Sequence, residues 1–389
     1  MTIRGAACIV GAFEHPTRHA PDKSTVQLHA EAALGALADA GLTRRDVDAY
    51  FCASDAPGLG AFSMIDYLNL SVRHVDTTEA GGASYPIHVA HAARAIAAGR
   101  CDVALITMAG RPRAEQRAVG AGPRTTAPGA PERPWEALAQ PGLAEFYAMV
   151  ARRHSHEYGT TAEQLAWIKV AASRHAQYNP QALRPEPVTV EEVLASPIVA
   201  DPLHRLDCCI ISDGGGALVV ARPEIARDLG RPRVTLRGAG EAPCGQAGGR
   251  VDLRWSGAAR SGPIAFAEAG VSPRDIKYAS IYDSFTITVL QQIEDLGFCD
   301  KGQGGRFVAD GNLISGIGRL PFNTDGGGLC NNHPAHRGGM IRTIEAVRQL
   351  RGAAHPAVQV PNCDLAIVQA TGGILGSRHA SATLILERE

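Results

Sequence analysis

The segment Asp39-Ala-Gly-Leu-Thr-Arg-Arg-Asp-Val-Asp48 returns later in the chain as Glu268-Ala-Gly-Val-Ser-Pro-Arg-Asp-Ile-Lys277. The two copies share Ala, Gly, Arg and Asp at matching positions, and most other positions hold conservative exchanges. A second pair of segments, residues 101–110 and residues 363–372, matches in the same order, each after a helical pattern. Similar units in the same order predict a chain built from two duplicated α/β halves.

The composition is that of a globular protein. A length of 389 residues exceeds the common size of one domain and fits two core units. Hydrophobic residues make up 45% and charged residues 20%, which excludes the disordered and fibrous classes. Lys+Arg number 38 and Asp+Glu 39, so no basic field favours nucleic acid or an anionic membrane. We therefore expect a small-molecule substrate.

Targeting signals and cysteine spacing bear on the compartment. The first apolar run is too short for a signal peptide, and no stretch of about 18 apolar residues could span a bilayer. We expect a cytoplasmic protein without membrane insertion. Its nine cysteines lack C-x-x-C spacing, which fits neither a disulfide framework nor a zinc ribbon. They are expected to be reduced thiols, and no metal site is predicted.

Apolar runs and helix caps indicate the local elements. The runs at residues 101–108, 216–221 and 365–370 are short and bounded by Gly, Asp or Pro, as in strands buried on both faces. Helices must then cover both faces of the sheet. Ser24, followed by Gln at the third position after it, forms a capping-box pattern, and Gly41 can end that helix.

An insertion interrupts the first half. Six prolines and no periodicity mark the stretch between residues 110 and 142. Helical patterns then return, and Thr161 with Gln164 forms another capping box. The predicted division is an N-terminal half at 1–110, an insertion (loop) domain at 111–199, the end of the N-terminal half at 200–232, and a C-terminal half at 233–389.

Polar and glycine-rich turns are where an α/β enzyme places its reacting groups, because free backbone N–H groups there can hold developing negative charge. Four such turns stand out in the sequence: residues 79–85, 282–285, 323–334 and 370–376.

These turns resemble a known family. Residues 323–334, with a Gly-Gly pair after them, resemble the Asn-x-x-Gly-Gly…Gly-His-Pro segment of thiolases. Tyr282-Asp-Ser-Phe285 stands where thiolases carry Asn-Glu-Ala-Phe and the sterol-carrier-protein type carries His-Asp-x-Phe. Residues 213–217 are similar to the Ser-Asp-Gly-Ala-Ala element, and residues 158–180 to the loop domain of the sterol-carrier-protein branch. The resemblance covers nearly the whole chain and implies an α/β thiolase fold: two mixed sheets with helices in a five-layered αβαβα sandwich.

The departures from the family pattern concern its cysteines. Gly82 falls where thiolases hold the nucleophilic Cys, and Ala370 falls at the second Cys. Tyr282 replaces the usual Asn or His, whereas the imidazole is kept as His333. Without the thiol at position 82, the acyl-Cys intermediate of thiolysis cannot form there.

A Gly-Gly-Ala turn combined with Tyr-Asp-x-Phe resembles the thiolase-like aldolases of steroid side-chain degradation, which cleave 3-hydroxyacyl-CoA thioesters by a retro-aldol step. The resemblance implies the same reaction without a covalent intermediate. It needs a base for the β-hydroxyl proton, an oxyanion hole for the enolate and an acid for the α-carbon. Those aldolases are expected to carry a second Tyr near the Gly-His-Pro turn, where this chain keeps His333, so the identity of the base stays open.

Two residues are the candidate acid/base groups. His333 could donate to a thioester oxygen or accept a hydroxyl proton; the alternative is an ordinary loop histidine. Tyr282 could exchange a proton with the β-oxygen, or it could only pack and hydrogen-bond. Gly82, Ala83 and Ser84 could present amides to the enolate, or they could form a plain turn with Ser84 as cap.

Four further residues are candidates for lesser roles. Asn323 could hold a water or the imidazole, or could serve only the turn. Gly372 and Gly373 could let the backbone approach the acyl chain, or could simply end a strand. Cys330, three residues before His333, could act as an alternative nucleophile, although a buried inert thiol is the plainer interpretation.

The resemblance also implies partners. Coenzyme A is expected as part of an acyl-CoA substrate, with no covalently bound cofactor, and a homodimer is expected. Some relatives need a small OB-fold, zinc-ribbon partner protein. Two other functions stay open: an acyltransferase or thiolase that uses Cys330, and a non-catalytic acyl-CoA or lipid-binding subunit.

Overall fold

The computed structural model describes residues 2–117, 142–244, 252–334, 338–375 and 377–389. Its main sheet has nine strands in the order β3-β2-β4-β7-β1-β8-β11-β10-β9. The first half supplies β1 (Cys8–Glu14), β2 (Ala49–Phe51), β3 (His74–Asp76), β4 (Val103–Gly110) and β7 (Gly214–Ala221). The second half supplies β8 (Val234–Cys244), β9 (Tyr278–Ile281), β10 (Leu365–Ile374) and β11 (Ser377–Arg388).

The duplication predicted from the two repeated segments is confirmed. The first copy closes α1 (Thr25–Ala40) and leads into β2, and the second closes α9 (Ala258–Ala269) and leads into β9. The other pair of matching segments forms β4 and β10. In each half these strands pair in parallel, β2 with β4 and β9 with β10. Equivalent segments therefore occupy equivalent places.

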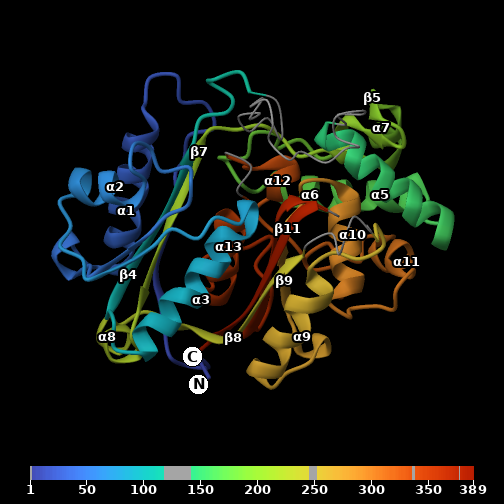
Figure 1. The fold of residues 1–389 in the computed structure, drawn as a ribbon. Helices are drawn as coiled ribbons and strands as arrows, with labels where there is room; N and C mark the ends of the chain where they lie inside the picture. The colour runs from blue at the N-terminus through green and yellow to red at the C-terminus, as the bar shows by residue number, and fades with distance from the viewer. Residues whose placement is uncertain (1, 118–141, 245–251, 335–337, 376) are drawn as a thin grey trace.

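Helices and strands are stacked in five layers. On the outside, α1 packs on β1, β4 and β7, and α9 packs on β8 and β11. Between them, α3 (Ser84–Ala97) and α13 (Gly339–Arg351) each contact strands of both halves and also each other. Figure 1 shows this order, with the two central helices between the strands of the two halves. The layers match the predicted αβαβα sandwich.

The sheets differ from the expectation in one respect. Two sheets were expected, whereas the two halves share one continuous strand order because β1 pairs with β8. The contact is short and antiparallel, with Cys8 opposite Thr235 and Ile9 opposite Val234. Since β1 and β8 are the first strands of their halves, this seam joins the duplicated units edge to edge.

Local signals in the sequence give the expected elements. The Ser24 side chain accepts a hydrogen bond from the Gln27 amide, and Gly41 ends α1 with φ +71°. Every residue of β4 and of β7 is buried, in agreement with strands covered on both faces. Among the described residues, no helix combines the length and the apolar character that a membrane crossing requires.

The middle of the chain adds helices beside the second half. These are α5 (Leu143–Tyr158), α6 (Ala162–Ala176) and α7 (Val190–Ala195), followed by the small hairpin of β5 (Ile198–Ala200) and β6 (Leu203–His204). Helix α6 packs against α10 (Thr286–Asp295), α11 (Gly304–Val308) and α12 (Gly327–Cys330). From α5, Tyr147 stacks on Phe285 with ring centroids 4.7 Å apart. The added helices thus lie beside the turn that follows β9. Within the ranges that the structure describes, the first half also holds α2 (Ala61–Leu68) and α8 (Pro223–Asp228).

Candidate active site

Tyr282 and His333 meet in the interior of the second half. Tyr282 directly follows β9, and His333 lies just beyond α12. The Tyr282 hydroxyl oxygen is 3.0 Å from Nε2 of His333, and the rings meet edge to face at a centroid distance of 5.4 Å. The two side chains are only 5% and 3% exposed. Both predicted acid/base residues therefore belong to one buried, hydrogen-bonded pair.

The protonation state of Tyr282 follows from its burial. Burial raises the pKa of Tyr282 well above its usual value, and a hydrogen bond from the Gly338 backbone only partly offsets this. Tyr282 is therefore a neutral phenol near neutral pH. Its oxygen accepts from the Gly338 backbone and lies within hydrogen-bond distance of Nε2 of His333. Which of the two atoms donates depends on the tautomer of the imidazole.

Gly82 lies against the ring of Tyr282. A Cβ atom built on Gly82 would be 2.3 Å from Cε2 of Tyr282 and 2.5 Å from the carbonyl oxygen of Thr371. Both distances are far inside van der Waals contact. The phenol ring therefore fills the space that a side chain at position 82 would need.

The turn at Gly81–Ala83 leads directly into α3. The Ala83 amide donates to the Ala80 carbonyl, and the Ser84 amide donates to the Gly81 carbonyl. The Ser84 hydroxyl accepts from the Ala80 amide at 2.8 Å. The amides of Ala83 and Ser84 thus form hydrogen bonds within the turn. The Gly82 amide is the remaining candidate of the three for binding an oxyanion.

Glycines let three backbone segments converge around this turn. A Cβ on Gly372 would lie 1.7 Å from the Ala80 carbonyl oxygen, and one on Gly339 would lie 2.1 Å from the Gly82 carbonyl oxygen. Gly373 follows with φ +72°. In this structure Gly372 brings β10 against the turn, and Gly339 does the same for α13.

Asn323 holds the end of β9. Its side-chain oxygen accepts from the Ile281 amide, and its side-chain nitrogen donates to the Ile281 carbonyl, both at 2.8 Å. The residue is fully buried with φ +40°. This amide pair fixes the strand end immediately before Tyr282.

Several neighbours of the pair are not among the candidate site residues named from the sequence. The Ser212 hydroxyl accepts from the His333 amide at 2.8 Å and donates to the Asn332 side chain at 2.7 Å. Cys209 and Tyr147 also act electrostatically on the Tyr282 phenol, where each would raise its pKa. Ser212 and Cys209 come from the segment before β7 and Tyr147 comes from α5, so only the fold brings them to Tyr282 and His333.

The thiols around the site are buried. The Cys330 sulfur accepts from Nζ of Lys169 at 3.1 Å, and the same ammonium donates to the Leu329 carbonyl at 2.8 Å. Burial raises the pKa of Cys330 even beside this lysine, and burial also raises the pKa of Cys209. Both are therefore protonated thiols near neutral pH, whereas the nucleophilic form is the thiolate.

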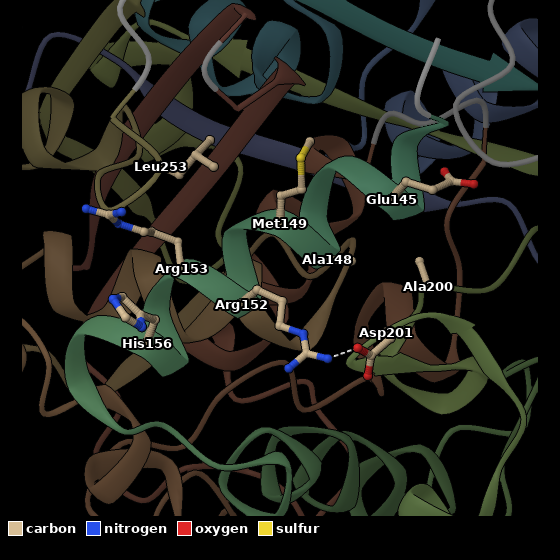
Figure 2. Close-up of a pocket in the computed structure, with 9 residues that line it drawn as sticks. All are labelled: Glu145, Ala148, Met149, Arg152, Arg153, His156, Ala200, Asp201 and Leu253. Atoms are coloured by element: carbon tan, nitrogen blue, oxygen red, sulfur yellow. Dashed lines mark ion pairs between the residues drawn. The ribbon is translucent and has the colours of Figure 1, made fainter. Parts of the chain in front are cut away.

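A groove with a volume of about 600 Å³ lies along the outward side of α5. Figure 2 shows Arg152, Arg153 and His156 along this helix, with Arg152 turned toward Asp201 in an ion pair. Met149 and Leu253 add apolar surface. The groove could hold a ligand with both anionic and apolar parts. Within the described ranges, no cluster of three or more His, Cys, Asp or Glu side chains is arranged to hold a metal ion.

Comparisons with known proteins show what this chain is similar to. The family model described as "Thiolase C-terminal domain-like" matches residues 245–388. A steroid side-chain-cleaving aldolase of Thermomonospora curvata is 37% identical over 381 residues, covering 90% of this chain and 92% of that protein. An acetyl-CoA acetyltransferase of Methanothermobacter thermautotrophicus is 34% identical, covering 92% and 93%.

Two further similarities point to C–C bond cleavage. A 17-hydroxy-3-oxo-4-pregnene-20-carboxyl-CoA lyase of Mycobacterium tuberculosis is 34% identical, covering 90% of this chain and 93% of that protein. The solved structure of an Ltp2-ChsH2(DUF35) aldolase superposes with a TM-score of 0.88 at 33% identity, covering 99% of this chain and 98% of that one.

Proposed function

From the premise that this chain belongs to the thiolase superfamily, on its aldolase-like branch, we propose that it cleaves 3-hydroxyacyl-CoA thioesters by a retro-aldol reaction. We further propose that the reaction runs without a covalent Cys intermediate. The observation that carries this second part is the contact between Gly82 and Tyr282, which puts a phenol ring where a nucleophilic side chain would stand.

The buried pair supplies the proton transfers. Nε2 of His333, directly or through the Tyr282 hydroxyl, takes the proton of the β-hydroxyl group. The C–C bond then breaks, its electrons move onto the thioester carbonyl, and the β-carbon leaves as a ketone or aldehyde. The amide of Gly82 is proposed to stabilise the enolate oxygen. The same acid/base pair returns the proton to the α-carbon, so no other reactant is consumed.

The substrate class follows from the relatives' names. In 17-hydroxy-3-oxo-4-pregnene-20-carboxyl-CoA the hydroxyl-bearing carbon is β to the thioester carbonyl, which is the pattern that a retro-aldol step requires. We propose a substrate of this pattern for the present chain, with the bond between the α- and β-carbons as the one that breaks.

The α5 groove is a candidate binding site for the phosphates of coenzyme A, because Arg152 and Arg153 bring two guanidinium groups to it. Their ion pairs with Asp201 and Glu157 are solvent-exposed and therefore easily exchanged. Replacing Arg153 with Ala should raise KM for the thioester severalfold and leave kcat unchanged. An unchanged KM would remove Arg153 from CoA binding.

We also propose a homodimer that works with a second protein. The second protein is supported by the solved Ltp2-ChsH2(DUF35) aldolase, whose name joins two components. The homodimer is what the family resemblance implies. Light scattering on the purified chain, alone and after co-expression with a DUF35-type protein from the same genome, tests both parts. A monomer that is fully active alone would contradict them.

The direct test of the reaction is product formation. The purified chain is incubated with 17-hydroxy-3-oxo-4-pregnene-20-carboxyl-CoA, and chromatography follows a 17-ketone and propionyl-CoA. Equal amounts of the two are expected. Binding without turnover, both alone and with a partner, would favour the non-catalytic alternative.

Acyl transfer is the second candidate, favoured by the similarity to an acetyl-CoA acetyltransferase over 92% of this chain. It requires a thiol that becomes acylated. Cys330, three residues before His333, and Cys209, which acts electrostatically on Tyr282, are the candidates for that role. Exposure to acetyl-CoA followed by intact-mass measurement should show an acetyl adduct if this candidate is correct, and no adduct if it is not.

A further inference from the structure

Glu14 ends β1 in the first half and is buried among residues of the second half. Its Oε1 atom accepts from Arg18 at 2.6 Å and from the side-chain amides of Asn331 at 3.1 Å and Asn332 at 3.0 Å. Its Oε2 atom accepts from Arg348 of α13 at 2.9 Å. One carboxylate thus gathers four donors directly beside the His333 loop.

A chain of hydrogen bonds leads from Glu14 to His333. Asn332 donates to Glu14 through its side-chain nitrogen and accepts from the Ser212 hydroxyl through its side-chain oxygen, at 2.7 Å. The Ser212 oxygen in turn accepts from the His333 amide at 2.8 Å. Ser212 also forms a parallel bridge with Pro334. Consecutive hydrogen bonds therefore join Glu14, Asn332, Ser212 and the His333 backbone amide.

The charge of Glu14 is matched to its surroundings. Burial alone would raise its pKa, but Arg18 and Arg348 outweigh burial and hold the pKa below its usual range. Arg18 also donates to the Asn331 side chain at 2.8 Å, and Asn331 donates to Asp325 at 2.8 Å. The carboxylate is therefore the acceptor shared by two arginines and two side-chain amides.

We propose that Glu14 is a positioning residue for His333, acting through Asn332 and Ser212. The N-terminal half then sets the place of an imidazole that the C-terminal half carries. The inference rests on the proposed function, because it assigns to Glu14 the alignment of Nε2 with the Tyr282 hydroxyl and the substrate.

The first experiment compares Glu14→Gln with Asp39→Asn. Asp39 is a matched control, because it also ties β1 to α13: it accepts from the Ala12 amide at 2.9 Å and from Arg351 at 2.7 Å. Its contacts lie outside the chain that leads to His333. Glu14→Gln should lower kcat at least tenfold with KM within about twofold, since small displacements of a catalytic group cost about a hundredfold. Asp39→Asn should leave both unchanged.

A second pair of variants covers the case in which Glu14→Gln does not fold. Asn332→Ala breaks the same chain without leaving a buried arginine unpaired, and should lower kcat to a similar extent. The double variant Asn332→Ala/Ser212→Ala should be no slower than the slower single variant, because both remove one path. If the double variant instead lowers kcat by the product of the two single-variant factors, the proposal is wrong.

A readout without turnover separates this inference from the proposed function. The His333 imidazole signals, assigned in NMR spectra by comparison with His333→Gln, should shift in Glu14→Gln or Asn332→Ala and stay in place in Asp39→Asn. If the wild type cleaves no 3-hydroxyacyl-CoA but the signals shift, only the proposed function fails. If the signals and kcat match those of Asp39→Asn, the positioning role is wrong.

Discussion

At the scale of single residues, one contact distinguishes this site from one built around a cysteine. Gly82 has no side chain, and the ring of Tyr282 occupies the space beside it. The two residues depend on each other: the glycine admits the ring, and the ring places its hydroxyl 3.0 Å from Nε2 of His333. A change at either position should therefore act on the same proton transfer.

The first prediction concerns the phenol. Tyr282→Phe keeps the ring and removes only the hydroxyl, so the fold should persist while kcat falls by about a hundredfold or more. Tyr50→Phe is the matched control, since Tyr50 is another buried tyrosine. Its hydroxyl forms a 2.6 Å hydrogen bond with the Thr107 hydroxyl, and neither residue belongs to the site. Full turnover in Tyr282→Phe, measured as ketone release, would show that Tyr282 is not an acid/base group of the reaction.

The second prediction concerns the glycine. Gly82→Ala places a methyl group 2.3 Å from the Tyr282 ring, and the ring must move to make room. We expect kcat to fall at least tenfold, with a loss of about 1–3 kcal/mol in the free energy of unfolding from overpacking. In Gly262→Ala of α9 the new methyl meets only the end of the Leu296 side chain, and activity should be kept. Equal activity in both variants would mean that the ring's position is unimportant.

Among the site residues, the sequence predicts those that stand in a recognisable motif. Tyr282, His333 and Gly82 stand at positions that a motif marks, and the structure brings the three together. Ser212 directly precedes the Asp-Gly of the Ser-Asp-Gly-Ala-Ala resemblance, but that resemblance does not reveal its bond to His333, which spans 121 residues of chain. For Asn323, a side chain that pairs with the Ile281 backbone has the same sequence signature as one that faces a substrate.

At the scale of elements, short-range signals carried the prediction well. The Ser24 cap and the Gly41 terminus bound α1 as expected, because both act within one helical turn. The seam between β1 and β8 was not foreseen, since strand pairing across the duplicated halves depends on how the halves meet. The domain boundaries drawn at 110, 199 and 232 stay predictions.

The third prediction concerns a tie between elements of the two halves. His91 of α3 bonds Asp76 of β3 at 2.6 Å and Glu241 of β8 at 3.1 Å. Hydrogen bonds from Asp76 and then Glu241 raise the pKa of His91 to about 9. The protonated His91 therefore stabilises the folded state fully when the pH is below about 6.5, the pKa of the unfolded chain. This stabilisation is lost as the pH rises through about 9, the pKa in the folded state.

Because solvent reaches His91 and its two carboxylate partners, we expect the protonated His91 to add on the order of 1 kcal/mol to the free energy of unfolding. The free energy of unfolding in urea is measured at pH 6 and pH 9.5 for the wild type and for His91→Gln. The difference between the two proteins should shrink at the higher pH. A difference that is constant across the range would contradict the assigned charge state.

At the scale of the whole molecule, the site is a product of the duplication. The first half contributes the Gly81–Ala83 turn, Ser212 and Glu14, and the second contributes Tyr282 and His333. The central helices α3 and α13 both begin at this point and contact strands of both halves. Neither half alone holds all the groups that the proposed reaction uses.

The central claim is that these groups break a C–C bond while no acyl group is attached to the protein. The most direct measurement is rapid-quench intact mass spectrometry during turnover of a 3-hydroxyacyl-CoA, with ketone release followed in the same samples. The account predicts that ketone accumulates while the protein keeps its unmodified mass at every time point. A protein mass raised by the acyl group, forming and decaying at the rate of product release, would contradict it.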